Sequence, residues 1–184
     1  ADQLDKSIPI YWVAGNHDVG NSPTTASLES YRKLFGPDNY SFQKNNCSFI
    51  AINSSVCSDP AAVPKEWDFL IEFLENELSK ASDNGSFHKI IFLHHPLFLE
   101  TVNEADNYFT IPSGRRQQII DLLDQYKVSA VFSGHLHRNN YRSVNGIKYV
   151  SSGPVGYPLD DDPSGIRVVE LDSHDLDHQY ISLE

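Results

Sequence analysis

The chain has 184 residues, and its 14 lysines and arginines stand against 25 aspartates and glutamates, a formal net charge of −11. This length is typical of one domain, and 40% apolar with 21% charged residues is ordinary for a globular protein rather than a disordered one. The negative charge argues against nucleic acid as a partner, although a phosphate ester could bind where metal ions reverse the local charge. The two cysteines are too few for a disulfide framework or a cysteine-rich zinc module.

No uninterrupted apolar run approaches the ~18 residues that a membrane-spanning helix needs, so we expect no membrane partner. The chain starts at Ala1, contains no methionine and carries no signal-peptide pattern. We therefore expect either that a segment precedes it in the gene product or that its start has been processed. The compartment is left open by the sequence, with a cytoplasmic location favoured.

Apolar runs bounded by turn residues predict strands, and apolar residues at spacings of three and four predict helices. In chain order, the predicted elements are a strand at 8–14, a helix capped by Ser22 and ending at Phe35, a hairpin of 40–43 and 47–53, a helix after Pro64, a strand at 89–93, a helix at 113–126, and strands at 128–132, 140–144, 147–151, 165–171 and 178–183. Strands that alternate with helices predict an α/β fold, and the strand-rich tail adds antiparallel pairs. The acidic segment 97–113 is long for a plain connection and suggests a lid or pocket wall, with a solvated surface loop as the alternative.

Polar clusters follow three of the predicted strands. The clusters are GNHD at 15–18, HHP at 94–96 and GHLH at 134–137. Ligands gather beyond the carboxyl ends of strands in an α/β sheet, so one sheet could bring Asn16, His94, His135 and His137 together. A single histidine at a strand end usually makes only a hydrogen bond, but three such clusters at one edge indicate a site.

The spacing and type of these residues point to metal ions. His135 and His137 are two residues apart, so an extended chain would send both imidazoles to the same side, toward one metal ion or two adjacent ones. Imidazole suits zinc and iron, whereas the amide oxygen of Asn16 suits harder ions such as manganese. A glycine precedes Asn16 and another precedes His135, and a glycine lets the backbone approach an ion closely.

Four segments, in this order, resemble the later motifs of the calcineurin-like metallophosphoesterases. They are GNHDVGNSPT (15–24), HHPLFLE (94–100), VFSGHLHRN (131–139) and GIRVVEL (165–171), and they are most similar to the calcineurin-like phosphoesterase domain-containing Ser/Thr phosphatases. The resemblance implies a layered β-sandwich flanked by helices. In the family, the first motifs, D-x-H and G-D-x-x-D, precede GNHD, and neither lies in the 15 residues before Asn16. Residues 1–184 therefore resemble a single domain that is the C-terminal two-thirds of a family member, without its N-terminal strands.

The resemblance also implies a ligand set. Asn16, His94 and His135 would bind one metal ion and His137 a second, with zinc, manganese or iron as the candidate ions. His94 is preferred to His95 because the family's ligand lies two residues before the proline. The second site would be incomplete in this chain, since the absent motifs supply its other ligands.

The implied activity is hydrolysis of phosphomonoesters, including phosphoserine and phosphothreonine proteins, by in-line attack of a metal-bound hydroxide. His17 would stabilise the phosphoryl oxygens or protonate the leaving alkoxide, Asp18 would orient His17, and Arg138 could grip the phosphate. Two alternatives stay open: a cyclic-nucleotide or other phosphodiesterase, and a truncated or non-catalytic domain that acts through protein contacts.

Overall fold

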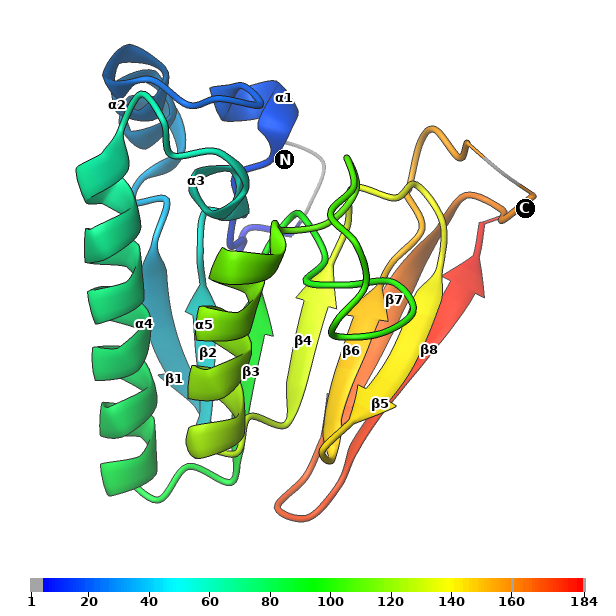
Figure 1. Cartoon of the computed structure of the whole chain (residues 1–184). Coiled ribbons are helices and arrows are strands. Elements are labelled where there is room, and N and C mark those ends of the chain that lie inside the picture. Colours follow the sequence, from blue (N-terminus) through cyan, green and yellow to red (C-terminus); the bar gives the residue numbers. More distant parts are fainter. Residues whose placement is uncertain (1–4, 160, 184) are drawn as a thin grey trace.

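A computed structural model describes residues 5–159 and 161–183, which form helices and two sheets (Figure 1). The elements are α1 Asn16–Val19, α2 Thr25–Phe35, β1 Tyr40–Lys44, β2 Cys47–Ala51, α3 Ser54–Ser58, α4 Pro64–Asp83, β3 His88–Phe92, α5 Ser113–Gln125, β4 Ala130–Ser133, β5 Asn140–Val144, β6 Ile147–Ser151, β7 Gly165–Leu171 and β8 Leu176–Ser182. Among the described residues, no helix is both long enough and apolar enough to cross a membrane.

The larger sheet has the strand order β1-β2-β3-β4-β6-β5. Its four inner strands, β2, β3, β4 and β6, pair in parallel. The outermost strands pair antiparallel, β1 with β2 and β5 with β6. The carboxyl ends of the parallel strands therefore meet at one edge of the sheet, the upper edge in Figure 1. The predicted polar clusters lie at this edge.

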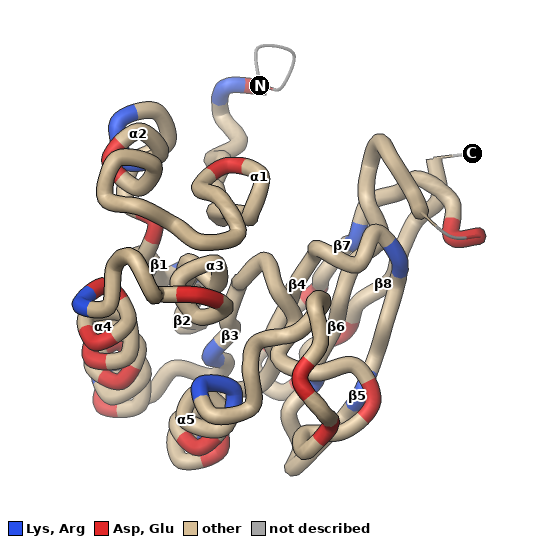
Figure 2. Tube along the Cα trace, turned by 45° about the horizontal axis from the view of Figure 1, so that its top comes forward, with Lys and Arg blue, Asp and Glu red and all other residues tan. Residues whose placement is uncertain are grey.

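Helices α4 and α5 cover one face of the larger sheet, the front face in Figure 1. The apolar stripe predicted for α4 is confirmed, because Leu70, Leu74 and Leu78 are all at most 1% exposed in the main core. Each fully buried leucine contributes roughly 1.5–3 kcal/mol to folding. Figure 2 shows several acidic residues along α4, and none of them is buried.

The hairpin of β7 and β8 covers part of the opposite face. A second apolar cluster joins the two sheets, and its buried members are Ile90, Ala130, Phe132, Val150 and Leu176. The layers are thus helices, a mixed sheet and a strand hairpin, which confirms the predicted α/β fold of a central sheet flanked by helices.

The predicted strand at 8–14 is wrong, because these residues form neither a strand nor a helix in the described chain. A strand needs a neighbour that pairs with its backbone groups, whereas here the ring of Tyr11 stacks on Phe42 at 3.7 Å and the Trp12 carbonyl accepts the Tyr40 hydroxyl at 2.8 Å. Trp12 is 44% exposed, so the apolar run lies across the sheet face rather than inside the sheet.

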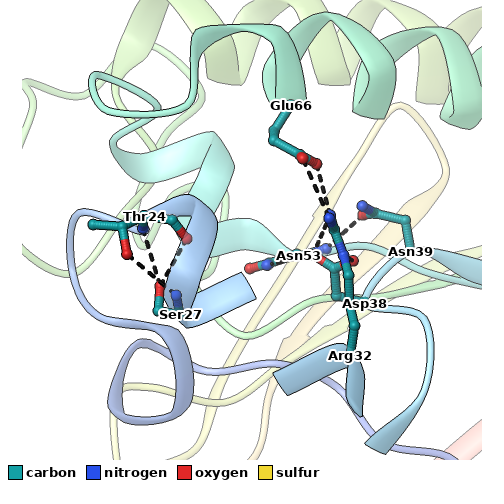
Figure 3. Close-up of polar contacts among 7 residues, drawn as sticks. All are labelled: Thr24, Ser27, Arg32, Asp38, Asn39, Asn53 and Glu66. Atoms are coloured by element: carbon teal, nitrogen blue, oxygen red, sulfur yellow. Dashed lines mark hydrogen bonds and ion pairs between the residues drawn. The ribbon is translucent and has the colours of Figure 1, made fainter. Parts of the chain in front are cut away.

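Helix α2 begins two residues later than predicted, because its N-cap is Thr24 and not Ser22. Thr24 is the true cap: its hydroxyl accepts the Ser27 N–H at 3.2 Å, and Ser27 Oγ accepts the Thr24 N–H at 3.0 Å (Figure 3). Ser22 Oγ instead donates to the Asp59 carboxylate. The short helices α1 and α3 were not predicted, and both lie at the edge that carries the polar clusters.

Candidate metal centre

Three of the predicted ligands converge at the carboxyl edge of the sheet. His94, just beyond β3, has its Nε2 atom 2.9 Å from Asn16 Oδ1 and 3.2 Å from His135 Nδ1. Asn16 begins α1, and its amide is fixed because Nδ2 donates to Asn21 Oδ1 at 2.9 Å, which leaves Oδ1 facing His94. One oxygen and two ring nitrogens from distant parts of the chain therefore face one point.

The protons in this cluster explain why it suits a cation. The Asn16 amide oxygen can only accept a hydrogen bond, so the short contact places a proton on His94 Nε2 in the metal-free chain. The lone pair of His135 Nδ1 accepts the same proton. Loss of that one proton would leave three lone pairs converging. Imidazole nitrogens with an amide oxygen are a donor set that transition metals accept, so the residues present fit a metal ion.

Two glycines lie beside the His94 ring. A Cβ atom on Gly15 would lie 3.0 Å from His94 Nδ1, and one on Gly134 would lie 3.7 Å from the same atom. The Gly134 N–H also donates to the His94 carbonyl at 3.0 Å. A separation of 3.7 Å is an ordinary contact, so it is Gly15 whose missing side chain lets Asn16 approach His94 closely.

His95 is not a member of the predicted set, yet its ring lies in the same cluster with His94 and His135. Ser54 Oγ accepts the backbone N–H groups of His94 and His95 at 3.0 and 2.7 Å and lies 3.0 Å from His95 Nδ1. The two N–H groups use both lone pairs of this hydroxyl, so its single proton is donated to Nδ1. The neutral His95 ring then carries its own proton on Nε2. The choice of His94 over His95 as the ligand stays a prediction.

A partly buried polar network lies beside the start of α3 (Figure 3). Arg32 of α2 pairs with Asp38 at 2.6 Å and with Glu66 of α4 at 2.6 Å. Asp38, only 4% exposed, accepts Asn53 Nδ2 at 2.8 Å, and Asn53 in turn caps α3 by accepting the Ser55 N–H at 3.1 Å. The start of α3 is thereby fixed next to the histidine cluster. Sequence reasoning missed this support, although an Asn-Ser-Ser run after an apolar strand is a capping signal.

His135 and His137 are not part of an extended chain, so that expectation is wrong. Strand β4 ends at Ser133, and the two histidines have φ angles of 65° and 54°, in the left-handed region. His135 turns to His94, whereas His137 Nδ1 lies 2.7 Å from the Tyr157 carbonyl. A carbonyl only accepts, so the proton of His137 is on Nδ1 and Nε2 keeps its lone pair free.

The remaining predicted residues are His17, Asp18 and Arg138. His17 and Asp18 are exposed in α1, which begins at Asn16. Asp18 accepts the Gly15 N–H at 2.9 Å, which makes it a cap of α1; its role in orienting His17 stays a prediction. Arg138 is exposed, and its phosphate contact also stays a prediction.

Burial keeps the central histidines neutral. Desolvation, helped by the nearby rings of His135, His17 and His137, lowers the pKa of His94 to about 4. Desolvation, with His135 and His94, lowers the pKa of His95 to about 3. Neutral imidazole is the form that binds metals, so at pH 7 the cluster is ready for an ion without first losing a charge.

The segment 97–112 forms a fixed wall beside the cluster. Arg116 of α5 is 1% exposed and donates to the carbonyls of Leu97, Glu104 and Ile111. The Glu104 carboxylate accepts three consecutive N–H groups, those of 99–101, at 2.8 to 3.2 Å. So many internal hydrogen bonds hold the segment in place, which favours its interpretation as a pocket wall over that as a lid.

Comparisons with known proteins agree with this geometry. The family model described as calcineurin-like phosphoesterase matches residues 1–139. The chain belongs to this family. Divalent metal ions are typical of it, in keeping with the Asn16, His94 and His135 cluster.

Two individual relatives match most of this chain. A Danio rerio protein named Serine/threonine-protein phosphatase CPPED1 is 38% identical over 180 residues, covering 98% of this chain and 58% of the relative. A Nostoc protein named 3',5'-cyclic-nucleotide phosphodiesterase is 30% identical over 160 residues, covering 82% of this chain and 52% of the relative. The chain thus spans little more than half the length of these relatives.

Solved structures show the same fold. The purple acid phosphatase PPD1 of yellow lupin superimposes with a TM-score of 0.64 at 17% identity, covering 92% of this chain and 38% of that one. At this identity the likeness concerns the architecture alone.

Proposed function

We propose that this chain is the metal-binding part of a phosphoesterase that hydrolyses phosphomonoesters, with phosphoserine and phosphothreonine proteins as its substrates. The observation that carries the proposal is that Asn16 Oδ1 and His135 Nδ1 lie 2.9 and 3.2 Å from His94 Nε2. The name of the Danio rerio relative, a serine/threonine-protein phosphatase, supports the substrate class. Because the chain spans 58% of that relative, the activity of the whole protein is part of the proposal.

Each residue has a role in this proposal. Asn16, His94 and His135 hold one ion and the free Nε2 of His137 faces a second, with zinc, manganese or iron as candidates. Bound ions would neutralise phosphate charge and activate the attacking water. His17, exposed at the start of α1, donates a proton to the leaving oxygen, and exposed Arg138 approaches the phosphate.

One experiment tests both metal binding and turnover. The purified chain is loaded with zinc, manganese or iron, its metal content is measured by elemental analysis, and hydrolysis of a phosphoserine peptide is compared with that of 3',5'-cyclic AMP. His135→Ala is the variant without the site. His174→Ala, an exposed histidine on the β7–β8 turn, is the matched control.

We expect metal in the wild type and the control, none in His135→Ala, and hydrolysis of the peptide only where metal is present. Preferred hydrolysis of cyclic AMP would favour the diesterase that the Nostoc relative's name suggests. Bound metal with no hydrolysis of either substrate would favour a binding role for this chain, and equal metal content in all three proteins would refute the site.

A further inference from the structure

Three exposed aromatic side chains stand around the metal-centre histidines. The ring centroids of Tyr108 and Phe109 lie 5.3 and 6.1 Å from that of His135, and the ring of Tyr157 lies 6.4 Å from that of His137. Their exposed fractions are 63%, 41% and 70%. These three residues are called the aromatic rim below.

The rim is held rigidly although its rings are exposed. The residues after Phe109, Thr110 and Ile111, are at most 1% exposed, and the Ile111 N–H donates to the Pro96 carbonyl at 3.1 Å. The Phe109 N–H donates to Asn107 Oδ1 at 2.8 Å, which closes the turn that presents both rings. Tyr157 is tied through its carbonyl to His137 Nδ1. These bonds fix the backbone that carries the rings, so a ligand that binds them need not order the segment first.

Single exposed apolar residues are normal on a protein surface, but a group of them around one polar site marks a binding surface. The carboxylates of the neighbouring wall are already satisfied: Glu100 pairs with Arg142, and Asp106 accepts the Ser113 N–H at 2.7 Å. Residues 97–112 contain no lysine or arginine, so this wall offers aromatic and apolar surface rather than positive charge to whatever flanks a phosphate bound at the histidines.

We propose that the aromatic rim is the subsite for the group esterified to the phosphate, and that it selects apolar and aromatic groups over acidic or small polar ones. This inference rests on the proposed function, because it needs a phosphate at the histidine cluster. In a protein substrate, the selected feature is an apolar side chain next to the phosphorylated residue.

The test uses two non-hydrolysable probes of equal charge, phenylphosphonate and methylphosphonate, titrated calorimetrically into the metal-loaded chain. Stacking of one ring on the rim should make phenylphosphonate bind about tenfold more tightly. Tyr108→Ala and Phe109→Ala should each reduce that ratio toward one while methylphosphonate affinity stays unchanged, and Tyr108→Phe should retain it. Phe69→Ala, which removes a 60% exposed ring on α4, is the matched control.

The outcomes separate this inference from the proposed function. Equal affinity of the wild type for the two probes overturns the rim subsite and leaves the phosphoesterase proposal standing. Loss of bound metal in Tyr108→Ala or Phe109→Ala, with an unchanged probe ratio, shows that the rings only support His135 and also overturns the subsite. Failure of both probes to bind the metal-loaded wild type overturns the proposed function together with this inference.

Discussion

Replacing Ser54 by alanine should destabilise the fold far more than a single hydroxyl suggests. Ser54 is fully buried and its Oγ accepts two backbone N–H groups while it donates to His95 Nδ1. An orphaned buried polar group costs about 1–3 kcal/mol, so losing partners for two N–H groups and one ring nitrogen should cost about 3–5 kcal/mol. That is a large share of the ~5–15 kcal/mol by which a domain is stable.

Ser55 is the matched control for this prediction. It is also fully buried and lies one residue away, yet within the described chain its Oγ atom has no hydrogen-bond partner. Ser55→Ala should therefore change the free energy of unfolding by less than about 0.5 kcal/mol, or raise it. Urea unfolding of the metal-free proteins in a chelator measures both values. Equal effects of the two substitutions, or a loss below about 1 kcal/mol for Ser54→Ala, would refute the bonding assigned to Ser54.

Three further predictions concern the metal centre. His94→Ala and His135→Ala should each abolish bound metal in elemental analysis; wild-type content in either variant would remove that residue from the ligand set. Gly15→Ala should weaken metal binding at least ~10-fold, because its Cβ would lie 3.0 Å from His94, whereas Gly114→Ala, with open space around its Cβ, should not. Because burial lowers the pKa of His94 to about 4 and of His95 to about 3, the unfolded chain binds more protons below pH 6.5. As the pH falls from 6.5 to 4, the free energy of unfolding of the metal-free protein should decrease by up to ~1.4 kcal/mol per pH unit for each of the two histidines. His95→Asn should make this decrease smaller, and an equal decrease in the variant and the wild type would contradict the prediction.

Local patterns were enough to predict most of the sheet. The 40–51 hairpin, the apolar stripe of α4 and the strands β3 and β4 follow from turn residues and periodicity within each segment, and all are present. The strand predicted at 8–14 is absent because a strand also requires a neighbouring strand to pair with, and no local sequence pattern shows whether one is there. The extended chain expected at His135 and His137 is absent because both residues have left-handed φ angles, and the contacts they make are with distant residues, His94 and Tyr157.

The candidate site could be predicted as a set of residues, but its construction could not. Strand-end clusters pointed to Asn16, His94, His135 and His137. The first three side chains do meet, whereas His137 Nδ1 turns to the Tyr157 carbonyl. Nothing in the sequence near His95 shows that Ser54, 41 residues earlier, fixes the position of its proton. Hydrogen bonds between segments so far apart become visible only once the sheet has placed them side by side.

The cluster joins four segments of chain, around Asn16, Ser54, His94 and His135, that no single helix or hairpin contains. It therefore exists only in molecules whose whole parallel sheet has formed, and a metal ion cannot bind tightly to a partly folded intermediate. Binding then draws the entire folding equilibrium toward the native state, by about 2.7 kcal/mol at a free metal concentration 100 times the dissociation constant. Metal supply would accordingly set how much of this protein survives proteolysis.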